Sequence, residues 1–313
     1  MISKKDKILV TGASGLVGSN LILNLSNKGH EVLGIDSKND LRIATNAYKL
    51  FDDFKPKIVF HLAAKVGGIH ANSNFKSDFY SDNVLINTNV VNACIKSKVD
   101  YIFAMGTGCA YPKRLEEKIL FEKDFLDGIP EITNDAYAYA KRGLLVHLKS
   151  LEESNSIKYT YCLPANLYGP FDNFHPLNSH VVPGLIRRFC DSKDKNLDEI
   201  YIWGDGSAKR DFLYIDDCIN AIIKLAEVQF CGSVNVSSNT LTSIKDLANI
   251  LKAETNFEGS IKYDQTKLSG QSQRIMDSSK MAKLGWNPET TLSEGIKKTV
   301  KWFIENRRYI REK

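Results

Sequence analysis

The sequence predicts an α/β fold, with helices on both faces of a doubly wound parallel sheet and a smaller C-terminal α/β lobe. Short apolar, β-branched runs alternate with stretches of helical periodicity, and this alternation is typical of parallel sheets. Hydrophobic residues make up 43% and charged residues 25% of the 313 residues, a balance typical of globular proteins. Because one domain takes about 150 residues, the length favours one large domain or two.

Five strands are expected in the first half of the chain, with helices between them. Lys7–Thr11 predicts the first strand, and Leu16–Lys28 predicts the helix that follows it. The other strands are expected at Glu31–Asp36, Lys57–His61, Tyr101–Gly106 and Lys158–Leu163. Helical periodicity fills the gaps between them, most clearly around Asn83–Lys96 and Tyr137–Glu153.

The regular alternation ends after Pro164. The segment Asn166–His180 carries Gly169 and two prolines among polar and aromatic residues, and this composition predicts a long loop. Loops of that length inside a compact domain usually serve a function. The segment is therefore expected to close over a bound ligand.

Two helix starts are predicted in the C-terminal third. Thr242 and Ser243 are candidate caps for a helix that continues to about Ala253. The pattern Thr291-Leu-Ser-Glu294 is a capping box, in which side chains at the helix start satisfy free N–H groups. It predicts a second helix that continues to about Glu305.

Composition and charge exclude several classes of protein. The net charge of +5 comes from 42 basic and 37 acidic residues spread along the chain, so nothing favours binding to nucleic acid or to a membrane surface. No apolar run approaches the roughly 20 residues that span a bilayer, and the first residues do not form a secretory signal, so a cytoplasmic protein is expected. The six cysteines lack CxxC spacing and the histidines lack metal-ligand spacing, so no metal site is expected.

A glycine-rich loop follows the first expected strand. Gly12, Gly15 and Gly18 lie between that strand and the next helix. Glycines here permit a tight turn and a close approach of the backbone to a pyrophosphate, which the helix N-terminus attracts. The loop therefore predicts a Rossmann-type dinucleotide site, with contacts from Gly12, Ser14, Gly15, Leu16, Val17 and Gly18.

The residues after the second strand leave the choice of dinucleotide open. Asp36 ends that strand, where an acidic side chain usually binds the ribose 2′-hydroxyl of NAD and repels a 2′-phosphate. Ser37 and Lys38 follow at once, and a hydroxyl with an ammonium can instead bind the 2′-phosphate of NADP. Adjacent residues thus favour opposite cofactors.

Tyr137 and Lys141 form a candidate proton-transfer pair. They lie four residues apart in an expected helix, so both side chains face the same way. A phenol with a pKa of about 10 is a poor acid or base at neutral pH, and a fixed positive charge nearby lowers that pKa. The pair is therefore expected to act in general acid–base catalysis.

Two further candidates follow the fourth strand. Thr107 and Cys109 come just after Gly106, and ligands in open α/β sheets bind beyond the carboxyl ends of the strands. Thr107 is placed to hydrogen-bond a substrate oxygen beside Tyr137. Cys109 is placed near the same crevice, although an inert buried thiol explains it equally well. His180 closes the long loop, a position that can face substrate.

These motifs together resemble a known family. The glycine loop with Tyr137-Ala-Tyr-Ala-Lys141 is similar to the extended short-chain dehydrogenase/reductase superfamily. Within it, the chain resembles the GDP-L-fucose synthase family over its full length, most specifically in Asp-Asn-Phe-His-Pro and Asn-Ser-His. The matching segments are His61–Ile69, Cys109–Pro112, Asn166–Pro170, Asp172–Pro176, Asn178–His180, Trp203–Gly204, Arg210–Leu213 and Leu284–Trp286.

The resemblance implies a reaction used in making sugars for cell-surface polysaccharides. In that family a GDP-linked 4-keto sugar is epimerised at C3 and C5 and then reduced at C4 by NADPH. The resemblance implies that Tyr137 protonates the C4 oxygen, while Lys141 lowers the pKa of Tyr137 and holds the nicotinamide ribose. It also implies that Cys109 is the base beside the ketone and that His180 is the acid on the opposite face.

The resemblance also implies which residues bind each ligand. For NADPH it implies, besides the glycine loop, Asp36, Ser37, Lys38, Leu41, Leu62, Ala63, Ala64, Lys141, Pro164, Asn166, Leu167 and His180. For the GDP-linked sugar it implies Asn166, Arg187, Trp203, Arg210 and Arg274. The fixed fork of arginine suits a pyrophosphate. NADH is the alternative cofactor because of Asp36, although a net reduction in the cytoplasm favours NADPH.

The residues before Cys109 depart from the family, which usually has two serines there. Thr107 keeps one hydroxyl and Gly108 lacks the other, so the pocket around the sugar is expected to be altered. A GDP-4-keto-heptose is therefore an alternative to the 6-deoxyhexose. Reduction at C4 without epimerisation is an alternative to both steps.

Other functions are less consistent with the sequence than a reductase. A nucleotide-sugar 4-epimerase or dehydratase that recycles NAD internally is the alternative enzyme, whereas a cofactor-sensing protein is disfavoured because the candidate catalytic residues are all present. Residues 1–165 with roughly 205–230 are expected to form the dinucleotide-binding domain, and 166–204 with 231–313 the substrate lobe. The resemblance also implies a homodimer through the helices at Asn83–Lys96 and Tyr137–Glu153, with a monomer as the alternative.

Overall fold

The computed structural model describes residues 2–153, 157–176, 178–266 and 272–310. Its centre is a six-stranded sheet in the order β10–β6–β4–β3–β1–β2, and all of its pairings are parallel. The strands are β1 (Ile8–Thr11), β2 (Val32–Ile35), β3 (Ile58–His61), β4 (Tyr101–Met105), β6 (Lys158–Pro164) and β10 (Gly232–Val236). The expected Rossmann-type fold is confirmed, since β1 lies between β2 and β3, where the strand order reverses.

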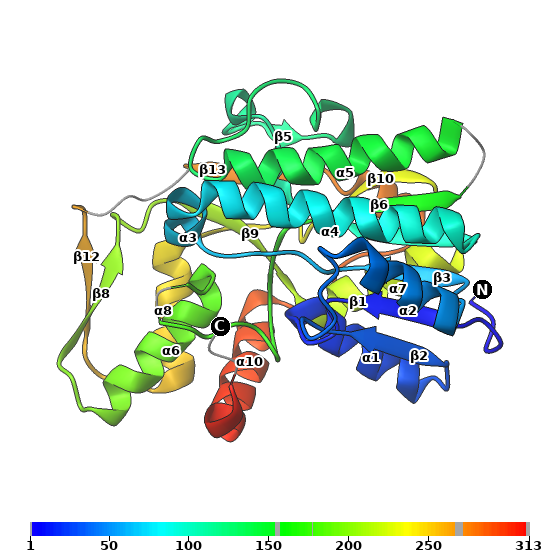
Figure 1. Cartoon of the computed structure of the whole chain (residues 1–313). Helices are drawn as coiled ribbons and strands as arrows, with labels where there is room; N and C mark the ends of the chain where they lie inside the picture. Colours follow the sequence, from blue (N-terminus) through cyan, green and yellow to red (C-terminus); the bar gives the residue numbers. More distant parts are fainter. Residues whose placement is uncertain (1, 154–156, 177, 267–271, 311–313) are drawn as a thin grey trace.

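Different helices cover the two faces of this sheet (Figure 1). One face carries α2 (Ala44–Phe54), α4 (Lys76–Lys96) and α5 (Asp135–Glu153), and α4 and α5 lie side by side. The other face carries α1 (Leu16–Asn27) and α7 (Ile215–Glu227). Alternate residues of a strand enter the two cores. Within the described ranges, no helix is both long and apolar enough to cross a membrane.

The helix expected from Asn83 begins earlier, at Lys76. The additional turns of α4 are mostly polar, and this composition hides their helical periodicity in the sequence. They are fixed by long-range contacts instead, because the buried Asn83 side chain bonds both backbone groups of Lys65, at 2.9 and 3.0 Å. The start of α4 therefore depends on the loop after β3.

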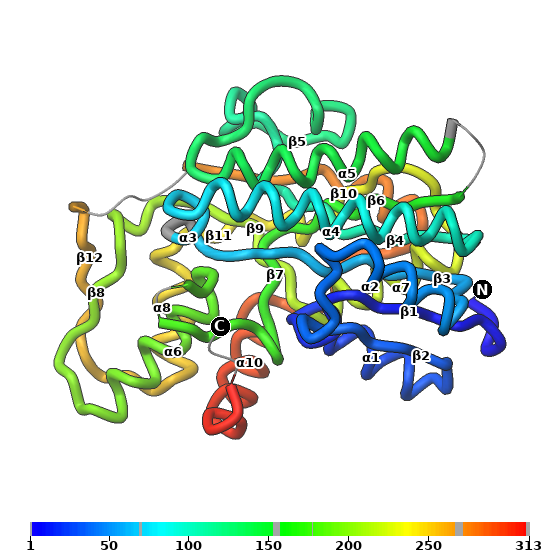
Figure 2. Tube along the Cα trace, in the orientation of Figure 1, coloured from blue at the N-terminus to red at the C-terminus, as the bar shows by residue number. Residues whose placement is uncertain are grey.

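A second sheet has the order β11–β9–β13–β5, with β7 also paired to β9, and a third consists of β8 and β12. The strands are β5 (Ile119–Leu120), β7 (Asn166–Tyr168), β8 (Glu199–Trp203), β9 (Lys209–Tyr214), β11 (Leu241–Ser243), β12 (Ser260–Asp264) and β13 (Gln273–Met276). The remaining helices are α3 (Ile69–Asn74), α6 (Val181–Asp194), α8 (Ile244–Thr255), α9 (Ser279–Lys283) and α10 (Leu292–Asn306). The trace in Figure 2 shows β8 and β12 at the end of the molecule far from β2.

Two local predictions about helix starts are confirmed, and one about a loop is partly wrong. The Ser243 side chain caps α8, and Thr291 with Glu294 forms the capping box of α10. The expected loop at Asn166–His180 instead begins as β7, because its first residues pair with β9. No local pattern predicts this pairing, because α6 and β8 lie between β7 and β9 in the sequence.

The division of the chain into two lobes stays a proposal. β10, which falls in the range expected for the substrate lobe, pairs with β6 in the central sheet. β9, which falls in the range expected for the cofactor domain, pairs with β7, β11 and β13 in the second sheet. These pairings favour boundaries that assign β10 to the cofactor part and β9 to the other.

Asn235 of β10 joins the central sheet to the second sheet. Its buried amide donates to the carbonyl oxygens of Leu120 and Asp277, at 3.0 and 2.9 Å. The hydroxyl of Tyr111 donates to its Oδ1 at 2.7 Å. Because Leu120 ends β5 and Asp277 follows β13, this one side chain fixes β13 beside the central sheet.

Asn235→Ala is expected to lower the free energy of unfolding by about 2–4 kcal/mol, because it leaves buried carbonyl and hydroxyl groups without partners. Equilibrium unfolding in urea measures the loss. The matched control is Asn249→Ala, an exposed asparagine of α8, which is expected to change stability by less than about 0.5 kcal/mol. Equal small losses in both variants would contradict the joining role of Asn235.

Candidate active site

The glycine-rich loop between β1 and α1 is shaped to receive a pyrophosphate. Gly12 has a φ of +73°, in the left-handed region that favours glycine, and a Cβ there would lie 2.8 Å from the backbone nitrogen of Ala63. A Cβ on Gly18 would lie 2.2 Å from the carbonyl oxygen of Gly12. Gly15 is the N-cap of α1, so the free N–H groups of its first turn face this loop. The residues present therefore fit a dinucleotide.

A chain of buried polar groups ties the end of β1 to the end of β3. The Thr11 hydroxyl accepts the N–H groups of Leu62 and Ala63, at 3.2 and 3.1 Å. It lies 2.9 Å from Nδ1 of His61, whose Nε2 lies 2.9 Å from Oδ1 of Asn87 in α4. Burial lowers the pKa of His61 to about 4, so the ring is neutral. A neutral ring that donates to Asn87 can accept from Thr11, which fixes the backbone of Leu62–Ala63 facing the glycine loop.

The loop after β2 is held by its own backbone contacts. Oδ1 of Asp36 accepts the N–H of Lys38 at 2.9 Å. Ser37 and Lys38 are exposed, whereas the Leu41 side chain is buried and its carbonyl oxygen accepts the Asn89 amide at 2.9 Å. The loop is thus fixed at Leu41, and Asp36 has a partner within its own turn.

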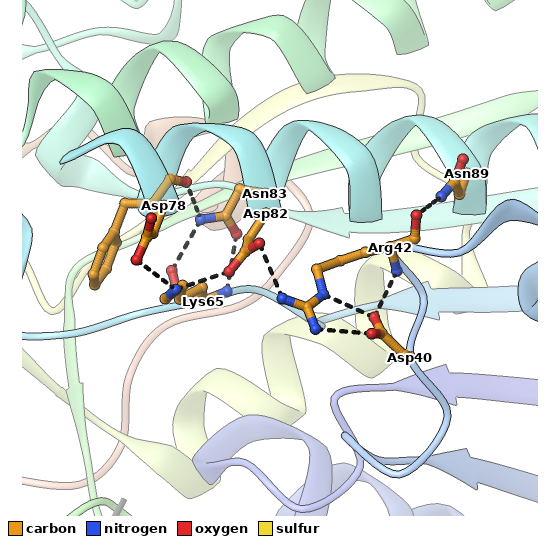
Figure 3. A network of polar contacts seen from close by, with 8 residues as sticks. Asp40, Arg42, Lys65, Asp78, Asp82, Asn83 and Asn89 are labelled. Atoms are coloured by element: carbon orange, nitrogen blue, oxygen red, sulfur yellow. Dashed lines mark hydrogen bonds and ion pairs between the residues drawn. The ribbon is translucent and has the colours of Figure 1, made fainter. Parts of the chain in front are cut away.

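An ion-pair network anchors this loop to α4 and to the loop after β3 (Figure 3). The Arg42 guanidinium bonds both carboxylate oxygens of Asp40, at 2.9 and 2.8 Å, and Oδ1 of Asp82 at 3.1 Å. Lys65 bonds the other oxygen of Asp82 at 2.8 Å. The Arg42 contacts hold the pKa of Asp40 below its usual value. Sequence reasoning missed this network because Asp82 lies forty residues from Arg42 along the chain.

Tyr137 and Lys141 lie on the first turns of α5 and face the same way. The Lys141 Nζ lies 5.9 Å from the centre of the Tyr137 ring and donates to the carbonyl oxygen of Met105, at the end of β4, at 2.7 Å. Burial lowers the pKa of Lys141 to about 8. Burial, with a contribution from Cys109, raises the pKa of Tyr137. The pKa of Tyr137 is thus raised overall rather than lowered, because burial dominates, and the phenol stays protonated at neutral pH. The lowering effect expected from Lys141 stays a prediction.

Cys109 lies on a 3₁₀ turn, Gly108–Ala110, directly after β4. Its N–H donates to Oγ1 of Thr107 at 3.2 Å, and its carbonyl oxygen accepts from Asn134 at 3.2 Å. The carbonyl oxygen of Ala110 accepts from Nε of the buried Arg142 at 2.9 Å. Asn134 lies just before α5 and Arg142 lies within it. The turn is therefore fixed against the helix that carries Tyr137. Sequence reasoning missed both, since neither has a motif of its own.

The Cys109 thiol differs from the buried cysteines of the core. Burial alone raises its pKa, but the Arg274 guanidinium, the Thr107 hydroxyl and Arg210 outweigh that effect, so the pKa of Cys109 is lowered. By contrast, burial raises the pKa of Cys162 well above its usual value. The lowered pKa therefore disfavours an inert thiol at Cys109, whereas Cys162 has the raised pKa of an inert buried thiol.

Three of the residues expected to bind the sugar nucleotide come together on β7, β9 and β13. Arg210 and Arg274 lie opposite each other in the paired strands β9 and β13. Arg274 donates to Oδ1 of Asn166 at 3.2 Å, and Asn166 donates to the carbonyl oxygen of Asp211 at 2.8 Å. Burial, with the charge of Arg274, lowers the pKa of Arg210 to about 10. This pair of guanidinium groups is suited to an anion.

Other expected residues lie on or beside α6 and β8. His180 is the N-cap of α6; its side chain is exposed at the surface, and desolvation of the ring by the protein around it lowers its pKa. A Cβ on Gly68, in the loop after β3, would lie 3.1 Å from the carbonyl oxygen of Ser179, so that loop meets the start of α6. Arg187 and Trp203 lie on α6 and β8, outside the central sheet, and their part in the site stays a prediction.

The carboxyl edge of the central sheet brings the remaining candidates together. The glycine loop follows β1, Leu62–Ala64 follows β3, and Thr107 and Cys109 follow β4. Pro164 ends β6, and its carbonyl oxygen would lie 3.2 Å from a Cβ on Gly108; Leu167 follows in β7. Among the described residues no three His, Cys, Asp or Glu side chains gather as metal ligands. The edge thus brings the loop that fits a dinucleotide together with the phenol and the thiol that are the candidate acid and base.

Comparison with known proteins agrees with this arrangement. The sequence pattern of the NAD dependent epimerase/dehydratase family matches residues 8–236. A putative GDP-L-fucose synthase of Arabidopsis thaliana is 40% identical over 310 residues, which cover 98% of this chain and 94% of the relative. The GDP-L-fucose synthase of Escherichia coli is 32% identical over 314 residues, covering 96% of this chain and 98% of the relative.

A solved structure agrees as well. The crystal structure of a GDP-L-fucose synthetase from Naegleria fowleri bound to NADP superposes with a TM-score of 0.90 at 30% identity, covering 100% of this chain and 96% of that one. The likeness thus extends over both the cofactor part and the C-terminal part. From the matched family pattern and the nearly full-length relatives, we conclude that the chain belongs to the NAD dependent epimerase/dehydratase family and, within it, to the GDP-L-fucose synthase family.

Proposed function

We propose that this protein reduces a GDP-linked 4-keto-6-deoxyhexose at C4 with NADPH, after epimerisation at C3 and C5, in the biosynthesis of cell-surface sugars in the cytoplasm. The observation that carries the proposal is the pairing, at one sheet edge, of a phenol whose pKa is raised with a thiol whose pKa is lowered. The names of the relatives and the NADP bound to the Naegleria fowleri protein support the sugar and the cofactor.

The reduction step uses Tyr137 as the acid. The chemistry that bound NADPH supplies is a hydride for C4. Burial keeps the Tyr137 phenol protonated, so it can give its proton to the C4 oxygen as the hydride arrives. Lys141, anchored on the Met105 carbonyl beside the ring, stabilises the phenolate that is left and holds the nicotinamide ribose.

The epimerisation step uses Cys109 as the base. Carbons beside a ketone lose protons readily, and a thiolate formed at lowered pKa is suited to remove them. Each inversion needs a proton delivered to the opposite face of the carbon, and His180 is the donor that we assign. Arg210, Arg274 and Asn166, with Arg187 and Trp203, are proposed to bind the GDP part.

The packing around Gly108 favours the smaller sugar. The sequence suggested that Gly108, in place of a serine, alters the sugar pocket. However, a Cβ at Gly108 would lie 3.0 Å from Sδ of Met276, so Met276 fills the space that a serine side chain would take. No extra room for a heptose follows from Gly108, and the 6-deoxyhexose is therefore the substrate that we propose.

A homodimer through α4 and α5 is part of the proposal. The two helices pack side by side on one face of the sheet. They expose several large apolar side chains, which a second copy would cover. These are Tyr80, Leu85 and Ile95 on α4 and Tyr139 and Val146 on α5.

Tyr137→Phe is expected to slow NADPH oxidation by a factor of about 10²–10⁴, because it removes the hydroxyl that protonates the C4 oxygen. Binding of the GDP-sugar, measured by calorimetry, is expected to change little. Tyr309→Phe is the matched control, since Tyr309 is exposed and lies outside the site, and its rate should equal that of the wild type. Normal turnover by Tyr137→Phe would contradict the assignment.

The rate of NADPH oxidation is expected to fall as pH rises through about 8, the pKa of Lys141. Above that pH the ammonium loses its proton and no longer stabilises the developing phenolate. Tyr137 does not account for the fall, because its own pKa is raised and it keeps its proton there. Initial rates at saturating substrate, measured across neutral and alkaline pH, test this. A flat or rising profile would refute the role of Lys141.

Turnover in deuterated water is expected to give a product labelled at C3 and C5, because Cys109 and His180 exchange protons with solvent there. NMR or mass spectrometry of the product measures the label. Cys109→Ser should lose it, whereas Cys231→Ser, which changes an exposed cysteine, should keep it. An unlabelled wild-type product would restrict the activity to reduction at C4.

A further inference from the structure

We propose that Arg274 is a positioning residue for Cys109: its guanidinium faces the Cys109 thiol and makes that thiol the reactive base of the site. This role differs from the nucleotide binding that the family resemblance implies for Arg274. It rests on the proposed function only in giving the thiol a reaction to perform. The test below therefore uses no sugar and no cofactor.

The backbone fixes Arg274 beside the Cys109 turn. β13 is held between two strands, with Arg274 opposite Arg210 of β9 and Ile275 opposite Ile119 of β5. Alternate residues of a strand share a face, so Arg274 and Met276 point the same way. The Sδ of Met276 would lie 3.0 Å from a Cβ on Gly108, the residue before Cys109.

A small hollow confirms that the two segments are neighbours. Gly108 and Arg274 both line it, together with residues of the loop that follows the turn. The Arg274 side chain, which shares a face of β13 with Met276, is thereby placed against the turn that carries Cys109. This placement follows from strand pairing and packing alone.

The Arg274 guanidinium is also held in place. It donates to Oδ1 of Asn166 at 3.2 Å, and Asn166 is itself fixed because it donates to the carbonyl oxygen of Asp211 in β9 at 2.8 Å. The guanidinium is positively charged, and its planar fork can bond Asn166 and the thiol together. Arg274 thus provides a positive charge at a fixed position.

The charged and titratable groups that act on Cys109 come from several segments. Tyr137 of α5 is one of them, since Cys109 adds to the rise in the pKa of Tyr137 that burial causes. Arg210 of β9 and Arg274 of β13 contribute positive charge, while Glu116 acts on Arg210. Burial works against the thiolate; among the groups that work for it, Arg274 contributes most, ahead of the Thr107 hydroxyl and Arg210. Without the Arg274 charge, the effect of burial should therefore dominate and the pKa of Cys109 should rise.

The test is the pH dependence of alkylation by iodoacetamide in the free protein, followed for each cysteine by peptide mass spectrometry. Wild-type Cys109 should reach half its maximal rate below about 8.5, the value of an ordinary thiol. In Arg274→Met that midpoint should rise by about one pH unit or more, so the rate at neutral pH falls about tenfold. Arg114→Met, which removes an exposed arginine from the loop after the turn, should leave it unchanged.

The other cysteines serve as internal controls. The exposed Cys231 should be alkylated alike in all variants, and the buried Cys94, Cys162 and Cys218 should stay protected while the protein is folded. If Arg274→Met exposes the buried cysteines, Arg274→Gln replaces it, because glutamine keeps an N–H donor for Asn166 without the charge. A folded variant without the charge whose Cys109 midpoint equals that of the wild type would overturn the proposal.

This measurement separates the inference from the proposed function. A low Cys109 midpoint that depends on Arg274 supports the inference even if turnover in deuterated water leaves the product unlabelled. Conversely, a labelled product together with a Cys109 midpoint that does not depend on Arg274 would support the epimerisation and show that Arg274 has no part in activating the thiol.

Discussion

One buried hydrogen bond, from Nζ of Lys141 to the carbonyl oxygen of Met105 at 2.7 Å, determines the layout of the site. Met105 ends β4, and the Cys109 turn follows it; Tyr137 lies one helical turn before Lys141 on α5. The bond therefore sets the phenol and the thiol relative to each other. Burying an ammonium costs free energy, which shows as the fall in the pKa of Lys141 to about 8. Such a costly position is understandable where a positive charge is needed beside a bound cofactor.

The pKa values of Tyr137 and Cys109 are shifted in opposite directions. Burial raises the pKa of Tyr137, and Cys109 adds to that rise, so the phenol keeps the proton that the proposed reduction requires. Burial acts on the Cys109 thiol as well, but Arg274, Thr107 and Arg210 reverse its effect, which suits the thiol to the proposed role of base. Neighbouring titratable groups whose pKa values are separated in this way identify the acid and the base of a site. A proton acceptor for epimerisation and a proton donor for reduction can therefore work in one pocket.

The parts of this account that depend on local patterns were predictable from the sequence. The glycine loop, the spacing of Tyr137 and Lys141, and the capping box at Thr291 each reveal themselves within a few residues. The parts that depend on contacts between distant segments were not. The pairing of β7 with β9 joins strands that are far apart in the sequence. The position of Arg274 beside Gly108 and the packing of Met276 against Gly108 arise only when β13 reaches the sheet edge. The rise in the pKa of Tyr137 has the same origin, since burial is a property of the folded chain.

The central claim is that Tyr137 and Lys141 carry out a net reduction at C4 rather than an internally recycled oxidation. Transfer of deuterium from specifically labelled NADPH to the sugar tests it most directly, because it follows the reacting hydride itself. The account predicts stoichiometric oxidation of the labelled cofactor and deuterium at C4 of the product. Conversion of the sugar with no net consumption of the cofactor, or with no deuterium at C4, would contradict it.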